Sequence, residues 1–355
     1  MPMTHLADID RHLAALGALP EHRRRVLRHW LQAIPLDRGR KALEHYLPKP
    51  LRQALPALMT EWQHLATLHA REPSEDGAER LLLRLHDGQS VEAVLLPRGG
   101  LCISSQVGCA VGCGFCMTGT LGLIRQLGSA ELLAQVATAR TLRAVDKVVF
   151  MGMGEPAHNL DAVLEAIETL GVEGGIGHKN LVFSTVGDER VFERLGQGAV
   201  KPALALSLHT TQPALRETLL PRAPRLSPEW LMAQACDYAR RTGYPLQVQW
   251  TLLEGVNDGD DEVERLVRLM RGQPAMLNLI PFNTVPGLPF RRPSWDACRD
   301  LARRLHARGI LTKLRDSAGQ DVEGGCGQLR ARLQPVRLQR RGAEPDPGRP
   351  SATSA

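Results

Sequence analysis

Three cysteines at a short, uneven spacing are the residues of this chain best suited to chemistry. Cys109, Cys113 and Cys116 form the pattern C-x3-C-x2-C. Three thiolates can bind three irons of a four-iron cluster and leave the fourth iron open, whereas a cluster held by four protein thiolates is more often an electron carrier. The spacing therefore favours a [4Fe-4S] cluster whose open iron can bind and reduce a small molecule.

A structural zinc site is the alternative for the same cysteines, with Cys102 or a distant histidine as the fourth ligand. Structural zinc usually takes paired C-x2–4-C hooks, but here a single hook, Cys113 to Cys116, stands beside a C-x3-C. A disulfide framework is less favoured still, because the chain has seven cysteines and four of them lie between residues 102 and 116. This usage is typical of a reducing compartment, so we expect a cytoplasmic protein.

Length and composition predict a folded protein without a membrane span. The 355 residues, 43% of them hydrophobic, suffice for one large domain and a smaller one. No apolar run reaches about 18 residues, and the first residues lack the charged and apolar regions of a signal peptide. The net charge of +6 and the pI near 9.1 suit a polyanionic partner such as RNA, although many basic proteins bind no nucleic acid.

The first 75 residues are expected to form a helical accessory domain that could bind RNA. Apolar residues recur at helical spacing from Leu6 to Leu16, and Gly17 marks the end of this helix. A second helix is expected after Pro20, with an apolar stripe made by Val26, Leu27, Trp30 and Leu31. The arginines at 23–25 and 28 then face outward, where they either meet phosphate or form a solvated basic face.

A short β linker is expected over residues 76–100. The strand-like segments 80–85 and 91–96 flank Asp87-Gly88, which is a hairpin turn signal. Gly99-Gly100 then leads into the strand-like Leu101-Cys102-Ile103. This linker carries Glu92.

Residues 101–330 alternate strand-like and helical segments, which predicts an α/β fold with a parallel sheet. The expected strands are 147–151, 181–184, 203–208, 246–252, 276–280 and 310–314. The expected helices are 129–142, 160–170, 228–241, 260–271 and 295–308. About six such units predict a partial (β/α)6 barrel rather than a closed eight-stranded one. The tail at 331–355, rich in Arg, Pro, Gly and Ser, is expected to be basic and disordered.

Polar residues gather where the predicted strands end. The carboxyl ends of barrel strands form the active face, so these residues and the cysteine loop should meet at one mouth. Taken singly, each has a plainer explanation, a strand-to-helix turn or a satisfied buried polar group. The segments are Gly152-Met153-Gly154-Glu155, Ser184-Thr185, Ser207-Leu208-His209 and Pro281-Phe282-Asn283.

With these segments placed, the chain resembles the RlmN/Cfr family of radical S-adenosylmethionine (SAM) RNA adenine methyltransferases. The resemblance runs from about residue 78 to 330 and rests on 101–109, 148–156, 204–209, 278–283 and 325–329. It implies a radical SAM core with a cluster on the three cysteines and SAM bound by Gly154, Glu155, Ser184, Ser207, Leu208 (through its backbone), His209 and Asn283.

The resemblance also implies how such an enzyme methylates an unreactive ring carbon. One SAM methylates Cys326, and a second SAM, cleaved at the cluster, gives the radical that takes hydrogen from this methyl group. The methylene radical left on Cys326 bonds to the adenine ring, and Glu92 then removes the ring proton. Cys102 releases the product by forming a disulfide with Cys326. Two SAM are used per turnover, and flavodoxin or ferredoxin is an expected electron donor. The expected substrate is rRNA, with tRNA as a further candidate, and carbon-2 is favoured over carbon-8.

Other residues and other functions remain as alternatives. Arg315 is a candidate contact to phosphate, while Cys236 and Cys298 are expected in the core. The family commonly has two alanines where this chain has Gly324-Gly325, and an arginine where it has Ala318. A radical SAM enzyme acting on another RNA base or on a protein is the second hypothesis, and a zinc-stabilised, non-catalytic RNA-binding protein is the third.

Overall fold

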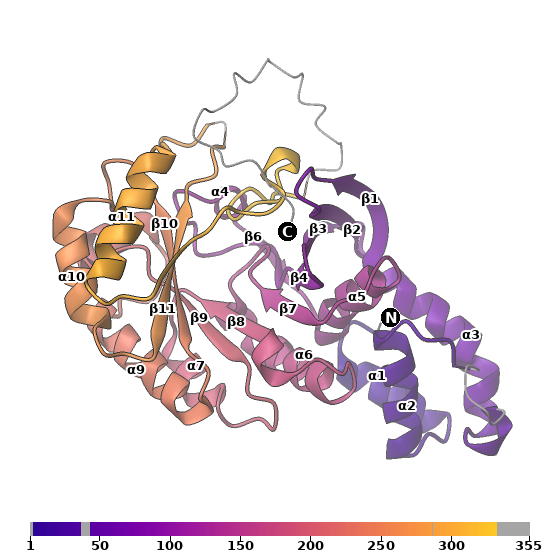
Figure 1. The fold of residues 1–355 in the computed structure, drawn as a ribbon. Coiled ribbons are helices and arrows are strands. Elements are labelled where there is room, and N and C mark those ends of the chain that lie inside the picture. The colour runs from indigo at the N-terminus through magenta and orange to yellow at the C-terminus, as the bar shows by residue number, and fades with distance from the viewer. Residues whose placement is uncertain (1–2, 37–42, 286, 332–355) are drawn as a thin grey trace.

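A ten-stranded mixed sheet organises the protein in the computed structural model, which describes residues 3–36, 43–285 and 287–331. The order is β1-β2-β3-β4-β7-β8-β9-β10-β11-β12 (Figure 1). Seven neighbouring strands from β4 to β12 run parallel. They are β4 (Gly100–Cys102), β7 (Lys147–Phe150), β8 (Leu181–Thr185), β9 (Ala203–Ser207), β10 (Leu246–Leu252), β11 (Ala275–Pro281) and β12 (Thr312–Leu314).

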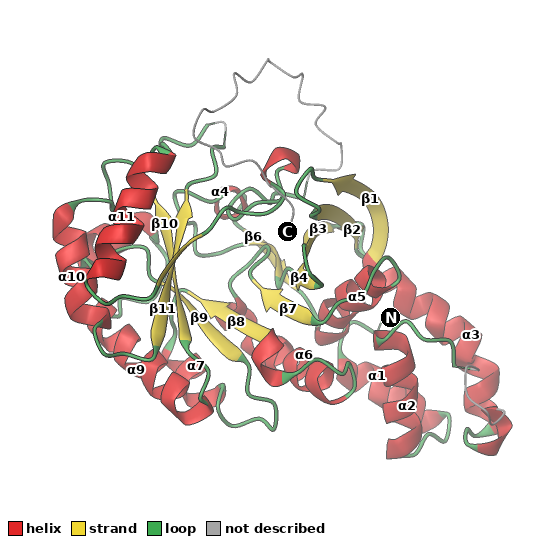
Figure 2. Ribbon diagram, in the orientation of Figure 1, coloured by secondary structure: helices red, strands yellow, loops and turns green. Residues whose placement is uncertain are grey.

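The parallel strands form an open barrel, as predicted. Within the described residues β1 and β12 each pair with one neighbour, so the sheet does not close. Six helices connect successive parallel strands and cover the outer face of the sheet (Figure 2). They are α5 (Ser129–Arg140), α6 (Leu160–Val172), α7 (Glu189–Arg194), α9 (Pro228–Thr242), α10 (Asp260–Met270) and α11 (Trp295–Ala307). Of these, only the short α7 was not predicted, because its six residues give little periodicity.

Three antiparallel strands extend the barrel sheet at the β4 edge. The predicted hairpin is β2 (Glu79–Arg84) with β3 (Ser90–Leu96), and β3 pairs with β4. Strand β1 (Thr67–Pro73) was not predicted and falls inside the expected helical domain of residues 1–75. Its side chains alternate between exposed and half-buried, so the strand carries almost no apolar signal.

Helices α1 (Leu6–Ala15), α2 (Pro20–Leu31) and α3 (Lys49–Gln63) form the N-terminal helical part. The first two confirm the predicted helices, and the four residues of the predicted α2 stripe are buried. All three contact α5 of the core. The backbone joins them too, because Ala130 donates to the Thr4 carbonyl at 2.9 Å and Leu6 donates to the Ser129 hydroxyl at 2.9 Å.

A small second sheet carries the cysteine loop. Strands β5 (Gln106–Gly108) and β6 (Leu123–Gln126) pair antiparallel and enclose the short helix α4 (Met117–Thr120). The remaining short helix, α8 (Pro213–Leu219), lies between β9 and α9. No helix among the described residues is long and apolar enough to cross a lipid bilayer. Of the tail predicted at 331–355, all but Ala331 lies outside the described residues.

Candidate active site

Two adjoining hollows lie at the carboxyl ends of the parallel strands. The first, here called the cysteine hollow, is lined by Cys109, Cys113, Cys116 and by residues that follow β7, β8, β9 and β10. The second, here called the β3 hollow, is lined by Val94, Leu96, Cys102, Val149, Met151 and by residues 317–318, 324–327 and 329 of one loop. Residues that line both hollows form a common wall, which includes Cys116, Thr118, Met151, Gly152, Cys326 and Gly327.

The cysteine loop is held by backbone hydrogen bonds. Cys109 donates to the Gly122 carbonyl at 2.9 Å, Gly114 to that of Leu219 at 3.1 Å, and Cys116 to that of Cys113 at 3.1 Å. Burial, followed by the charges of Cys116 and Cys109, raises the pKa of Cys113 well above its usual value. The three sulfurs are therefore close enough to repel one another as thiolates, so a cationic group is needed to hold them ionised.

This donor set fits an iron-sulfur cluster. Within the described residues, no three His, Cys, Asp or Glu side chains are arranged to hold a single metal ion. A cluster takes each thiolate on a different iron, so its cysteines line the edge of a hollow rather than surround one point. Burial also raises the pKa of Cys109 to about 12, so ionising this thiol costs free energy that bound iron must offset.

Glu155 is a buried carboxylate with both oxygens engaged. Its Oε1 accepts from the Ala157 N–H at 3.0 Å and its Oε2 from the Val186 N–H at 3.0 Å. Its own N–H donates to Gln106 Oε1 at 2.8 Å. Burial raises the pKa of Glu155 to about 7, which the hydrogen bonds partly oppose. Glu155 thus orders the turns after β7 and β8 while it lines the cysteine hollow.

The glycines beside Glu155 serve close packing between two loops. A Cβ on Gly152 would lie 2.7 Å from the Ile103 carbonyl carbon and oxygen. A Cβ on Gly154, where φ is +103°, would lie 2.7 Å from Gln106 side-chain carbons. The resemblance implied that Gly154 binds SAM, and glycine lets a ligand approach the backbone closely. The structure adds that they let the turn after β7 approach the segment after β4, while both also line the cysteine hollow.

His209 is a buried, neutral imidazole that lines the cysteine hollow. Its Nδ1 accepts from the Thr251 N–H at 3.0 Å, so the neutral ring carries its proton on Nε2. Burial, with a smaller effect of the Arg216 charge, lowers the pKa of His209 to about 3. The ring meets the edge of Phe115 with centroids 4.8 Å apart. His209 has a φ of +64°, which is rare outside glycine and marks a tightly determined turn.

The other predicted SAM residues divide between the hollow and its surroundings. Ser184 and Ser207 line the cysteine hollow. The Leu208 side chain is fully buried in the core and does not line the hollow, although its N–H donates to the Gln249 carbonyl at 3.1 Å. Asn283 binds the Cys326 loop, since its Nδ2 donates to the Cys326 carbonyl at 2.9 Å and its buried Oδ1 has no partner.

Sequence reasoning missed several residues of this site. Gln249 and Thr251 line the cysteine hollow from β10, and only the alternation of this strand points to them. Arg216, on α8, is 4% exposed and donates through Nη2 to the Val186 carbonyl. Burial lowers the pKa of Arg216 to about 10, while Cys113 and Glu155 raise it. Nothing in the sequence of α8 distinguishes this arginine from a surface one.

Cys102 lines the β3 hollow near Cys326, which belongs to the common wall. Burial, then the nearby Cys326, raises the pKa of the Cys102 thiol to about 12. Both are free thiols, and Cys326 is exposed to the hollows. The Cys326 loop is fastened to α4, because Met117 donates to the Gly327 carbonyl at 2.8 Å and Thr118 Oγ1 to that of Leu329 at 2.6 Å. The helix α4 and the Cys326 loop, which are more than 200 residues apart in the chain, are thus in direct contact.

Glu92 is buried on β3 and bound on both oxygens. Its Oε1 accepts from Arg80 Nη1 at 2.6 Å and its Oε2 from the Arg330 N–H at 2.7 Å. Burial raises the pKa of Glu92 although Arg80 opposes the shift. It shares a strand face with Val94 and Leu96, which line the β3 hollow, but its carboxylate does not line either hollow. Cys236 and Cys298, each 1% exposed, lie in the core as predicted.

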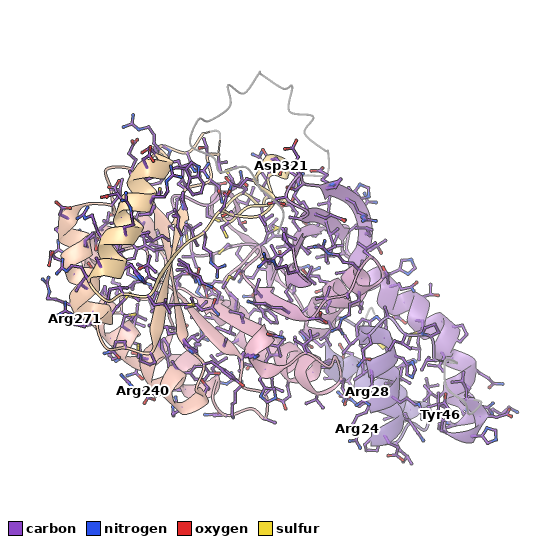
Figure 3. The ribbon with its side chains drawn as sticks, viewed as in Figure 1. Arg24, Arg28, Tyr46, Arg240, Arg271 and Asp321 are labelled. Carbon is purple, nitrogen blue, oxygen red and sulfur yellow. The ribbon has the colours of Figure 1, made fainter. Side chains whose placement is uncertain are left out.

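The arginines of α2 are partly engaged with their own domain. Arg23 pairs with Asp10, and Arg25 stacks on the Tyr46 ring at 3.6 Å. Arg24 and Arg28 are exposed, with Arg28 3.4 Å from Glu173 (Figure 3).

An open parallel barrel with three cysteines and a ring of polar groups at its carboxyl edge defines the class of radical SAM enzymes. The chain matches the model of the radical SAM superfamily over residues 103–270. A protein of Methylibium petroleiphilum named a probable RNA methyltransferase is 68% identical over 92% of this chain and 93% of its own. One of Pseudomonas aeruginosa with the same name is 59% identical over 94% and 97%.

A solved structure agrees with these relatives. The crystal structure of a radical SAM methyltransferase from Sphaerobacter thermophilus superposes with a TM-score of 0.80, at 35% identity, over 92% of this chain and 98% of that one. The chain therefore belongs to the RlmN/Cfr-type family of radical SAM methyltransferases. It is an enzyme of the methyltransferase class, and its family uses a [4Fe-4S] cluster and SAM.

Proposed function

We propose that this enzyme methylates a ring carbon of adenine in RNA through a methylated Cys326. The observation that carries the proposal is the place of Cys326 in the wall common to both hollows, beside Cys116 on one side and Cys102 on the other. A thiol in this place can take a methyl group from SAM on one side and offer it to a second molecule on the other. The names of the relatives support RNA as that second molecule.

Cys109, Cys113 and Cys116 would hold the cluster. Gly154, Glu155, Ser184, Ser207, His209 and the backbone at Leu208 would bind SAM in the cysteine hollow, whereas Asn283 acts by holding the Cys326 loop. When bound, the cluster supplies an electron that cleaves SAM to methionine and a 5′-deoxyadenosyl radical. His209 presents Nε2–H as a fixed donor, and its low pKa keeps the ring neutral at any working pH.

The chain's own residues then carry the methyl group. Cys326 Sγ takes the methyl of a first SAM and releases S-adenosylhomocysteine. The S-methyl group loses one hydrogen atom to the radical from a second SAM, and the methylene radical that remains adds to the ring carbon of adenine. That ring carbon gives up its proton to Glu92 and one electron, which the oxidised [4Fe-4S] cluster would accept. The Cys102 thiolate then attacks Cys326 Sγ and forms a disulfide, and the electron pair of the broken carbon–sulfur bond takes up a proton to complete the methyl group.

Glu92 can act as this base once the Arg330 N–H leaves its Oε2. Glu92→Gln retains an oxygen for Arg80 and removes the basicity. We expect methylation of Cys326 to persist in this variant, while product formation falls by about 100-fold or more. Unchanged product formation would assign Glu92 to the structural ion pair with Arg80 instead.

The whole proposal is tested by mass spectrometry of nucleosides from ribosomal and transfer RNA of cells with and without the gene. Loss of a methyladenosine in the deletion strain supports it, and the retention time separates carbon-2, which family frequency favours, from carbon-8. An unchanged set of methyladenosines would overturn the assignment to adenine in these RNAs.

The second candidate is a radical SAM enzyme that acts on another RNA base or on a protein. It is favoured if a different methylated nucleoside or peptide disappears in the same strain. The physiological reductant, for which flavodoxin and ferredoxin are candidates, is identified by which of them supports turnover of purified enzyme.

A further inference from the structure

The β3 hollow has an apolar floor that continues down the inner face of the sheet. Val149 and Met151 line the hollow and pack with Val182, Ala203 and Ala205. Because side chains alternate along a strand, Lys147 lies on the same face as Val149, one step closer to the beginning of β7. Lys147 thus stands at the edge of the apolar floor.

Two further cations reach the same region from β12. Lys313 pairs with Asn278 of β11, and Asn278 pairs with Gln249, which lines the cysteine hollow, so all three share the inner face. Arg315 follows on the same face, where its Nε donates to Asn278 Oδ1 at 2.9 Å. Asn278 is 1% exposed and therefore held in place by its surroundings, so this hydrogen bond fixes the position of the Arg315 guanidinium.

The three cations Lys147, Lys313 and Arg315 are here called the cationic rim, and they form no ion pair within the part of the chain that the structure describes. Among the described residues, no carboxylate lies within ion-pair distance of any of the three, although 23 such pairs are formed elsewhere. Burial, then the charges of Arg315 and Lys313, lowers the pKa of Lys147, so the three charges are near enough to repel one another. An anion at the rim would relieve this repulsion.

The rim adjoins the β3 hollow on two sides. Lys147 stands two residues before Val149, and Arg315 stands two residues before Ser317, and both of these neighbours line the hollow. The charge of Arg315 also reaches the Cys326 thiol, whose pKa it lowers slightly against the larger effect of burial. A ligand that fits both would place a flat apolar part in the β3 hollow, next to Cys326, and a negative charge at the cationic rim.

We propose that the β3 hollow and the cationic rim together form a nucleotide site, which holds a base in the hollow and its phosphodiester at the rim. This inference rests on the proposed function and deepens it, because it places the RNA on the Cys102 side of Cys326. SAM then occupies the opposite side of the common wall. A base stacks on apolar and sulfur-containing side chains, while Lys and Arg bind phosphate.

The test uses the salt dependence of binding by the full-length, anaerobically purified protein. The probe is a fluorescent single-stranded RNA of adenosines. Each phosphate contact contributes about 0.7 to the slope of log affinity against log salt, so K147A/K313A/R315A should lower the slope by about 2. The matched control is R240A/R268A/R271A, three exposed arginines at the outer helices (Arg240 and Arg271 are labelled in Figure 3).

A control slope equal to the wild-type slope, together with a reduced slope for the rim variant, supports the site. A rim variant that retains the wild-type slope, or that changes no more than the control, overturns it. The charge-conserving K147R/K313R/R315K should keep the slope, which separates charge from folding. Adenosine 5′-monophosphate should compete for the probe better than ribose 5-phosphate, since only the former fills the hollow; equal competition overturns the base site.

Failure of this inference is distinguishable from failure of the proposed function. Methylation of Cys326 by SAM needs no RNA, and the mass of the peptide that contains Cys326 reports it. We expect the wild type to show this modification in the absence of RNA. Its absence from the wild type would overturn the proposed function, while the salt slopes would still decide the nucleotide site.

Discussion

The carboxylate of Glu155 and the guanidinium of Arg216 hold one residue from opposite sides. Glu155 Oε2 accepts from the N–H of Val186, and Arg216 Nη2 donates to the carbonyl of the same residue. Val186 lines the cysteine hollow. Two buried groups of opposite charge type therefore determine the backbone of a turn that borders the proposed SAM site.

The first prediction concerns Arg216→Gln. The variant leaves the Val186 carbonyl buried without its donor, which costs about 1–3 kcal/mol. We expect the free energy of unfolding of the apoprotein in urea to fall by that amount. Arg222→Gln is the control, because exposed Arg222 also donates to a backbone carbonyl near the cysteine loop, that of Ala110 at 3.4 Å. Equal stability of both variants would show that Arg216 does not hold the turn.

The second prediction concerns Cys326→Ala and Cys102→Ala. Without Cys326 no methyl carrier exists, so methylated RNA should be undetectable. Without Cys102 the product is not released, so a covalent protein–RNA adduct should accumulate and migrate slowly in a denaturing gel. Cys298→Ala, in the core and away from both hollows, is the control and should retain turnover. Product from Cys326→Ala, or free product without adduct from Cys102→Ala, would contradict the assigned roles.

The third prediction is a pH dependence of stability caused by His209. Its folded pKa, about 3, lies below the unfolded value near 6.5, so the unfolded state binds more protons between these two values. The stability that His209 contributes is present above pH 6.5 and is lost as the pH falls toward 3. At pH 5 the loss is about 2 kcal/mol, from 1.36 kcal/mol per pH unit.

This pH effect is measured by urea unfolding of the apoprotein between pH 5 and 7. His209→Gln should flatten the dependence, whereas His306→Gln, on the helix α11, should not change it. The wild-type slope persisting in His209→Gln would assign the acid sensitivity to other groups.

The fourth prediction concerns Asn283→Ala, which removes the hydrogen bond to the Cys326 carbonyl. A single lost hydrogen bond costs about 1 kcal/mol, so the fold should survive while the Cys326 loop is less well held. We expect slower methylation of Cys326 and faster hydrogen exchange over residues 319–328. Ser184→Ala also changes a polar residue at the mouth but leaves this loop untouched, and it serves as the control for the exchange rate.

The sequence predicted the long, periodic elements and the strand-end clusters well, because burial on a parallel sheet imposes clear patterns. Strand β10, for example, has the bounds that its alternation of apolar and polar residues suggested. Elements whose residues are mostly exposed escaped prediction, as β1 did. At the site, Arg216 and Gln249 carry no local signal, since their roles depend on which distant loop they meet. The sequence also could not show that Gly154 is needed for packing. Gln106, which is 48 residues away in the chain, occupies the space that a Cβ on Gly154 would need.

The attachment of the helical part to α5 has a consequence for substrate choice. Arg140 of α5 donates to the Leu31 carbonyl at the end of α2 and to that of Gly174 after α6, so one side chain joins the accessory helices to the barrel layer. The separation between the Cys326 sulfur and Arg24 or Arg28 (both arginines are labelled in Figure 3) is thereby set by packed elements rather than by a linker. Under the proposed function, an RNA that binds Arg24 or Arg28 through its phosphates and presents its target base to Cys326 must therefore span one set distance.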